Sequence, residues 1–127
     1  MENIPNIITR QHLLENPNHI FVFGDNLMRK GKGGAAKLRD LPNTYGFITK
    51  RRPDYNTKSY YKPAEYEGRF KIELFILEER IKKNPDKIYL ITKLGAGLAN
   101  KFNIWEMVIR PNIVVLSKYK NVRFLYN

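Results

Sequence analysis

The fold is decided by the stretch IFVFGDNLMRKGKGGAA, residues 20–36. Its first four residues form a continuous apolar run that ends at Gly24, which is the pattern of a buried central strand. The next residues are polar and rich in glycine, and residues 34–40 then predict a short helix that Pro42 stops. A strand, a glycine loop and a helix in this order are typical of an α/β sheet.

A second stretch, IYLITKLGAGLA at residues 88–99, repeats this order. Residues 88–91 predict a strand, Gly95 and Gly97 lie in the loop after it, and a helix follows from about Ile104. Because ligands of open α/β sheets bind beyond the carboxyl ends of the strands, we expect both loops to border one crevice. Their bare backbone N–H groups would then form a phosphate cradle. The alternative is that both loops are ordinary turns at strand exits. Neither loop has the spacing of a P-loop or of a dinucleotide fingerprint.

The remaining elements alternate between strands and helices. They are strands at 45–49 and 122–126, a helix over 63–83, and two helical pieces from about 104 to 118 that Pro111 separates. The order predicts an α/β layer fold with right-handed crossovers and mostly parallel strands, at least in the centre of the sheet. If residues 1–10 form a strand, we expect it at an edge, where Pro5 is tolerated.

Length and composition limit the classes of protein. A chain of 127 residues predicts one domain, residues 1–127. The absence of cysteine excludes a disulfide framework, a thiolate metal site and a cysteine nucleophile. With only His12 and His19 available, we expect no metal site and no cofactor. No apolar run is long enough to span a bilayer, and residues 1–10 lack the plan of a signal peptide, so we expect a cytoplasmic protein without a membrane partner.

The net charge of +11 predicts attraction to polyanions or to phosphorylated ligands. Basic residues are densest in two places, Arg29 to Arg39 and Lys50 to Arg52. The charge alone also fits a solvated basic face.

At these residues the chain resembles the macro domain, a family that binds ADP-ribose in a crevice made by two such loops. The family's first loop follows a buried strand and carries an asparagine, a glycine cluster and a small-residue helix, and residues 21–36 are similar in order and spacing. Its second loop is G-x-G-L followed by a tryptophan and an acidic residue, and GAGL at 95–98 with Trp105 and Glu106 is similar. The resemblance covers roughly residues 19–126. It implies a three-layer α/β/α fold with a mixed, centrally parallel sheet.

The closest likeness is to the divergent branch that removes ADP-ribose from acidic residues or from DNA. That branch has a strand ending in Ile-Thr-Lys, whose lysine is the nucleophile, and FITK at residues 47–50 implies this role for Lys50. Hydrolytic members have an aspartate directly after G-x-G-L, where this chain has Ala99, and of the family's Asn-Ala-Ala-Asn signature only Asn26 remains. The chain also resembles small uncharacterised phage-associated proteins with the run V-F-G-D-N-L. The resemblance therefore implies the crevice more than it implies catalysis.

The residues expected to bind the ligand are Asp25, Asn26, Gly31, Lys32, Gly33, Gly34, Ala35, Gly95, Ala96, Gly97 and Leu98. Asp25 would accept the adenine amino group or a ribose hydroxyl, or else cap the turn after the strand. Asn26 would hold the distal ribose, or else occupy a left-handed turn position. Lys32 would reach a pyrophosphate, or else be a solvated loop lysine.

Lys50 would pair with a ligand phosphate or attack the anomeric carbon, if its pKa is lowered, or else belong to a plain basic edge. Tyr60 or Tyr61 would stack on a base, or else pack as part of a lid. We expect Trp105 in the core.

Three functions remain open from the sequence. The first is binding of ADP-ribose or a related NAD-derived, possibly cyclic, nucleotide, either free or attached to protein or nucleic acid. The second is an ADP-ribosyl hydrolase that uses Lys50, with Asp25 in place of the missing acid. The third is a basic nucleic-acid-binding protein, favoured by the charge and the interleaved tyrosines.

Overall fold

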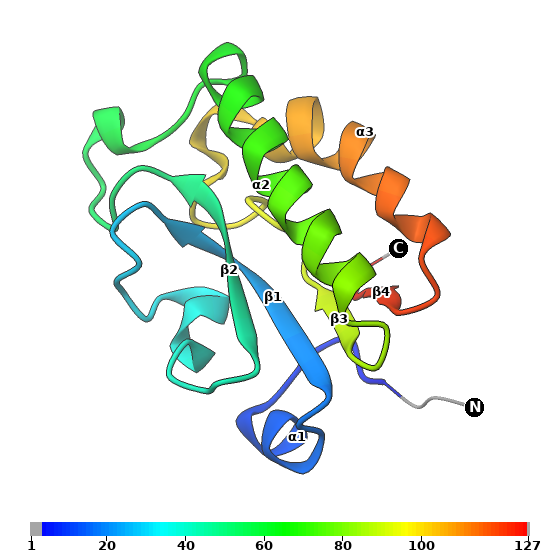
Figure 1. Cartoon of the computed structure of the whole chain (residues 1–127). Helices are drawn as coiled ribbons and strands as arrows, with labels where there is room; N and C mark the ends of the chain where they lie inside the picture. The colour runs from blue at the N-terminus through cyan, green and yellow to red at the C-terminus, as the bar shows by residue number, and fades with distance from the viewer. Residues whose placement is uncertain (1–3, 127) are drawn as a thin grey trace.

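The fold centres on a four-stranded sheet in the order β2-β1-β3-β4 (Figure 1), as seen in a computed structural model that describes residues 4–126. The strands are β1 (His19–Asn26), β2 (Thr44–Lys50), β3 (Ile88–Ile91) and β4 (Val122–Phe124). Every neighbouring pair is parallel, so all four carboxyl ends lie at the same edge. The α/β class is confirmed, and the central strand and the strand at 88–91 lie where the apolar runs predicted them.

The expectation of a mixed sheet is wrong for the described residues, because the sheet is parallel throughout. Helical segments lie between consecutive strands and return the chain to the same end of the sheet, which makes each new strand parallel to its neighbour. Residues 4–9 form no strand, and residues 1–3 lie outside the described part. The edge strand considered for residues 1–10 is therefore not found where the structure describes them.

The helical segments vary in winding. They are α1 (Arg10–Glu15), η1 (Gly34–Leu38), η2 (Thr57–Ser59), α2 (Pro63–Lys83), η3 (Asn100–Phe102), the π-helical η4 (Trp105–Ile109), α3 (Arg110–Ile113) and η5 (Val114–Lys118). The predicted helix over 63–83 is confirmed with the same bounds. The short helix after the first glycine loop is confirmed as a 3₁₀ segment.

Pro111 does not divide the following helix into two pieces, as the sequence predicted. Residues 104–118 are helical without a break, and the winding changes from π to α to 3₁₀ along them. In the π turn before the proline, the N–H of Arg110 donates to the carbonyl of Trp105. Proline lacks an N–H and crowds the preceding turn, and a π turn is a common way for a helix to absorb such a local strain.

Helical segments cover both faces of the sheet. Val22 of β1 belongs to a large apolar cluster with residues of α2, η4 and α3, and Trp105 is part of it, as predicted. Phe21 and Phe23 point to the opposite face, where a smaller cluster contains residues of α1 and η1. Figure 1 shows α2 running across the sheet with α3 beside it. Both faces of β1 are therefore buried, which is the reason for its unbroken apolar run.

Two side chains of α2 form hydrogen bonds with β2, the edge strand that ends in Lys50. Buried Glu73 accepts a hydrogen bond from the N–H of Ile48 at 2.8 Å, and the Tyr66 hydroxyl donates to the carbonyl of the same residue. Burial beside the Glu73 charge raises the pKa of Tyr66 well above its ordinary value. Because these backbone groups are satisfied by α2, the end of β2 is fixed relative to the rest of the sheet.

Candidate functional site

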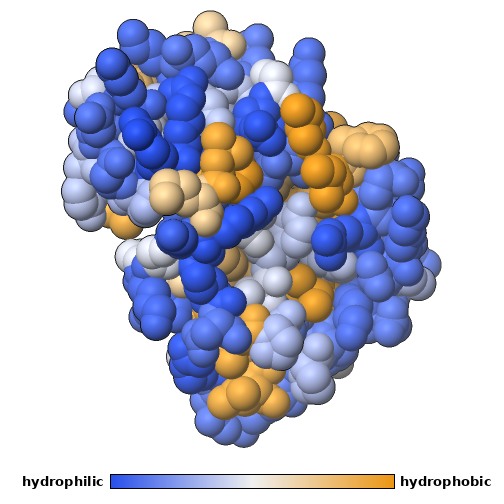
Figure 2. All heavy atoms as spheres, turned by 60° about the vertical axis from the view of Figure 1, so that its left-hand side comes forward, coloured by the Kyte–Doolittle hydropathy of each residue, from blue (hydrophilic) through white to orange (hydrophobic). Residues whose placement is uncertain are grey.

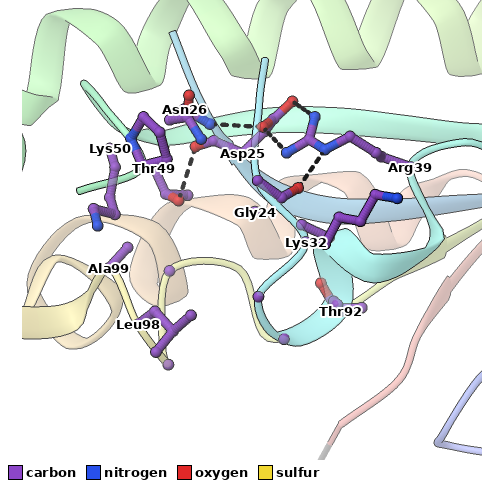
Figure 3. Close-up of a pocket in the computed structure, with 18 of the residues that line it drawn as sticks. Gly24, Asp25, Asn26, Lys32, Arg39, Thr49, Lys50, Thr92, Leu98 and Ala99 are labelled. Carbon is purple, nitrogen blue, oxygen red and sulfur yellow. Dashed lines mark hydrogen bonds and ion pairs between the residues drawn. The ribbon is translucent and has the colours of Figure 1, made fainter. Parts of the chain in front are cut away.

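A pocket of about 650 Å³ lies beyond the carboxyl ends of β1, β2 and β3 (Figure 3). Both glycine loops line it, as the sequence predicted. The loops also touch, because a Cβ placed on Gly33 would lie 3.0 Å from Leu98 Cδ1. Behind them, a Cβ on Gly24 would lie 3.6 Å from the backbone nitrogen of Gly95. The volume is within the range that holds a small organic ligand.

All but one of the residues predicted to bind the ligand line this pocket, and Lys50 lines it too. The predicted residues that do so are Asp25, Asn26, Gly31, Lys32, Gly33, Gly34, Ala35, Gly95, Gly97 and Leu98. The exception is Ala96, which is half-buried and packs against the large apolar cluster instead. Its neighbours in the G-x-G-L loop face the pocket, and the middle residue of such a tight loop turns to the other side.

Several backbone N–H groups on the pocket-lining loops make no hydrogen bond within residues 4–126. They belong to Gly34 and Ala35 at the start of η1, and to Gly97 and Leu98 in the second loop. Gly34 and Ala35 are the first residues of η1, and the first N–H groups of a helical segment have no partner inside that segment, so these two are free to bind an anion. Gly34 has a φ of +57° and Gly95 a φ of +73°, a backbone conformation that favours glycine.

The carboxylate of Asp25 is fully engaged by the protein. Its Oδ1 accepts from Arg39 Nη2 at 2.7 Å and from the N–H of Asn26 at 2.8 Å. Its Oδ2 accepts from Arg39 Nη1 at 3.1 Å and from Arg29 Nη1 at 3.4 Å. A carboxylate offers about four acceptor positions, and the Asp25 side chain is only 2% exposed. Asp25 therefore holds the first loop in place, and the structure favours its role as a cap of the turn after the strand over contact with a base.

Arg39 is the partner that sequence reasoning missed. Besides the ion pair, its Nε donates to the Gly31 carbonyl at 2.7 Å and its Nη2 donates to the Lys30 carbonyl at 3.1 Å. Its guanidinium also lies 5.3 Å from the centre of the Phe23 ring. Arg39 thus ties the glycine loop to the end of β1. The sequence shows it only as one more basic residue in a cluster, with nothing that separates it from Lys37.

Asn26 also organises the first loop. Its Oδ1 accepts from the N–H of Met28 at 3.0 Å, and its Nδ2 donates to the Lys30 carbonyl at 2.7 Å. This favours the turn interpretation of Asn26. The left-handed backbone position is not Asn26 itself, however, but Arg29, with a φ of 54°.

Lys50 is a buried cation at one end of the pocket. Its Nζ donates to the Asp54 carbonyl at 2.8 Å and lies 4.4 Å from the centre of the Tyr60 ring. Burial lowers the pKa of Lys50 from the ordinary lysine value, and the nearby Asp54 charge opposes that shift. The ammonium group forms no salt bridge within residues 4–126.

The stacking residue expected at Tyr60 or Tyr61 is not available there, because both side chains are buried. Tyr61 packs 5.1 Å from the ring of Tyr66 and lies under the Arg51 guanidinium. The neighbouring Tyr55 is 75% exposed and lines the pocket. The three tyrosines lie close together in the sequence, at positions 55, 60 and 61, and the sequence does not show which of them faces outward.

Two threonines at strand ends complete the pocket floor. The hydroxyl of Thr49 donates to the Asp25 carbonyl at 3.3 Å, and that of Thr92 donates to the Val22 carbonyl at 2.9 Å. Ala99 also lines the pocket. His12 and His19 instead pair with each other through ring nitrogens 2.9 Å apart, on α1 and β1.

Neither a metal cluster nor a membrane span is found in the described part of the chain. Within residues 4–126, no group of three or more His, Asp or Glu side chains is placed to hold a metal ion. In the same residues, no helix is both long and apolar enough to cross a membrane.

Residues 4–100 match a family of unknown function, DUF7831, and the chain belongs to that family. The matched region includes the first glycine loop, Lys50 and the second glycine loop. No curated protein and no solved structure matches the chain. The description of the family names neither a ligand nor a reaction.

Proposed function

We propose that this protein binds ADP-ribose or a related NAD-derived nucleotide, cyclic forms included, in the pocket between the two glycine loops. The observation that supports the proposal most strongly is the charge of the pocket wall. Four lysines, Lys30, Lys32, Lys50 and Lys93, line it without a salt bridge to any residue in 4–126. Among residues 4–126, Asp25 is the only acidic residue on the wall, and Arg39 neutralises it.

A diphosphate suits this wall in both charge and geometry. Unpaired ammonium groups would pair with its negative charges, and the free N–H groups of the two loops would donate to its oxygens. The remaining volume would hold the two riboses and the base, since the pocket measures about 650 Å³. The same pocket would accept the nucleotide free or attached to a protein or nucleic acid.

The proposal includes the finer assignment of the fold as macro domain-like. It is supported by two loops that meet at the carboxyl ends of parallel strands, and by helical segments on both faces of the sheet. The uniformly parallel sheet differs from the mixed sheet that the resemblance implied.

Within residues 4–126 the pocket offers no free acidic side chain, and this favours binding over hydrolysis. Resolving an adduct on Lys50 or activating water requires a general base. Asp25 has no acceptor position left, and the other candidate position holds Ala99. The lowered pKa of Lys50 would suit a nucleophile, but without a base the residue acts as a phosphate partner.

Calorimetry with ADP-ribose tests the proposal. We expect saturable binding, and we expect Lys50→Ala to weaken it by about 10- to 100-fold, because a charge-assisted hydrogen bond contributes on the order of 1.5–3 kcal/mol. Lys71→Ala is the matched control, since Lys71 is an exposed lysine on α2 outside the pocket. Incubation with ADP-ribosylated protein or DNA should leave the attached ADP-ribose in place, whereas release of ADP-ribose would indicate the hydrolase. The absence of both heat and a thermal shift at millimolar ADP-ribose would refute the proposal.

A further inference from the structure

Selective recognition of a base requires directional groups, and the pocket has few that are free. Adenine presents an exocyclic amine, which needs an acceptor, whereas guanine and hypoxanthine present an oxygen at the same position. In the part of the chain that the structure describes, the only carboxylate on the wall is Asp25, whose acceptor positions are filled by Arg39, Arg29 and a backbone N–H. A carboxylate that is already saturated cannot favour one of these bases over another.

The other polar side chains on the wall do not supply this selectivity either. The amide of Asn26 is used on both sides, by the N–H of Met28 and by the carbonyl of Lys30. The hydroxyl protons of Thr49 and Thr92 are used in hydrogen bonds to backbone carbonyls, so neither side chain has a donor left for the oxygen of guanine or hypoxanthine. The lysines attract anionic groups, which every nucleotide diphosphate carries in the same place, whatever its base.

Two exposed apolar groups border the same pocket. Tyr55 is 75% exposed and Leu98 is 56% exposed, and both line it. Leu98 extends from the second loop toward Gly33 of the first, which puts an apolar surface where the loops meet (Figure 3). Contact with an aromatic or aliphatic side chain is tolerant of base identity, because every base has an apolar face.

We infer that the pocket selects its ligand by the diphosphate and tolerates different bases, which rest against Tyr55 and Leu98. The inference rests on the proposed function and extends its ligand class from ADP-ribose to analogues that carry another purine in place of adenine. It also assigns Tyr55 as the residue that contacts the base. The contrast is with a site in which a free carboxylate selects adenine.

The test compares three ligands by calorimetry on the whole chain: ADP-ribose, its hypoxanthine counterpart and its guanine counterpart. We expect dissociation constants within about tenfold of one another, because no buried polar group is left unpaired when the base changes. An ADP-ribose affinity at least about 100-fold tighter than both others would overturn this inference and leave the proposed function standing. Failure of all three to bind would overturn the proposed function and this inference together.

Variants at position 55 test the assigned contact. Tyr55→Ala should weaken the binding of all three ligands by a similar factor of about tenfold, and Tyr55→Phe should retain most of the affinity because the ring remains. Phe75→Ala, which removes an exposed ring on α2 outside the pocket, should change none of them. Unchanged affinities in Tyr55→Ala, or a loss confined to ADP-ribose, would overturn the assignment.

Discussion

Asp25 and Arg39 are 14 positions apart in the chain and meet through two hydrogen bonds of 2.7 and 3.1 Å. In the sequence, the position of Asp25 after a buried strand and before a glycine loop predicts an acid that contacts a ligand. In the structure it is buried, and a buried carboxylate is stable only when it is paired and hydrogen-bonded. The Asp25 carboxylate is therefore used, through Arg39, to hold the first glycine loop in place.

At the residue scale, we predict that Arg39→Ala lowers the free energy of unfolding by about 2–4 kcal/mol. Removing one member of a buried pair leaves the other charge without compensation, and the lost hydrogen bonds to Lys30 and Gly31 add to the effect. Urea denaturation measures the change. Arg29→Ala is the control, and its loss should be about 1 kcal/mol or less, because Arg29 is 54% exposed, its contact with Asp25 is 3.4 Å, and its 2.7 Å hydrogen bond to the Gly46 carbonyl is exposed to solvent. Equal losses in the two variants would contradict the prediction.

At the scale of elements, the second glycine loop contains two glycines with different constraints. Gly95 has a φ of +73°, and a Cβ on it would lie 2.9 Å from Ile109 Cδ1 of η4. Gly97 has no left-handed φ, and a Cβ on it would meet nothing within 4 Å. Gly95 is thus required for the loop to pack against the helix, whereas Gly97 is required only if a ligand approaches the backbone closely.

We predict that Gly95→Ala lowers the free energy of unfolding by about 1–3 kcal/mol, because the added methyl group is strained and crowded. Gly97→Ala should change stability by no more than about 0.5 kcal/mol. Denaturation of both variants, followed by ADP-ribose titration of Gly97→Ala, separates the two roles. A Gly97→Ala variant that is stable and binds normally would show that Gly97 lies outside the ligand contact.

At the scale of the whole molecule, the net charge of +11 lies over a largely hydrophilic surface. On the face shown in Figure 2, apolar residues lie in separate patches among hydrophilic ones. A charge of this size favours weak, sequence-independent attraction to nucleic acid, whatever the pocket binds. The nucleic-acid alternative is thus distinguished from nucleotide binding by its dependence on salt.

We predict that affinity for duplex DNA falls on the order of 100-fold between 50 and 200 mM salt, as expected if about four phosphates are contacted. ADP-ribose affinity should fall by less than about tenfold over the same range, because a single diphosphate displaces few counterions. Fluorescence anisotropy for DNA and calorimetry for ADP-ribose measure the two slopes. DNA binding that persists at 200 mM salt, together with no ADP-ribose binding, would favour nucleic acid as the ligand.

Much of the fold was predictable because it depends on residues close together in the chain. The apolar run before Gly24 and the helical spacing over 63–83 identify their elements directly, since burial on one or both faces imposes a period on neighbouring side chains. The meeting of the two glycine loops followed from one further rule, that parallel strands end at the same edge.

What the sequence by itself determined about this protein is the order of its elements and the place where two bare loops would meet. Only the tertiary structure decided that Arg39 pairs with Asp25, that Tyr55 rather than Tyr60 faces the pocket, and that Ala96 packs against the large apolar cluster. The physical reason is that secondary structure follows from local periodicity. The partner of a charge and the exposure of a ring depend instead on how segments distant in the chain pack together.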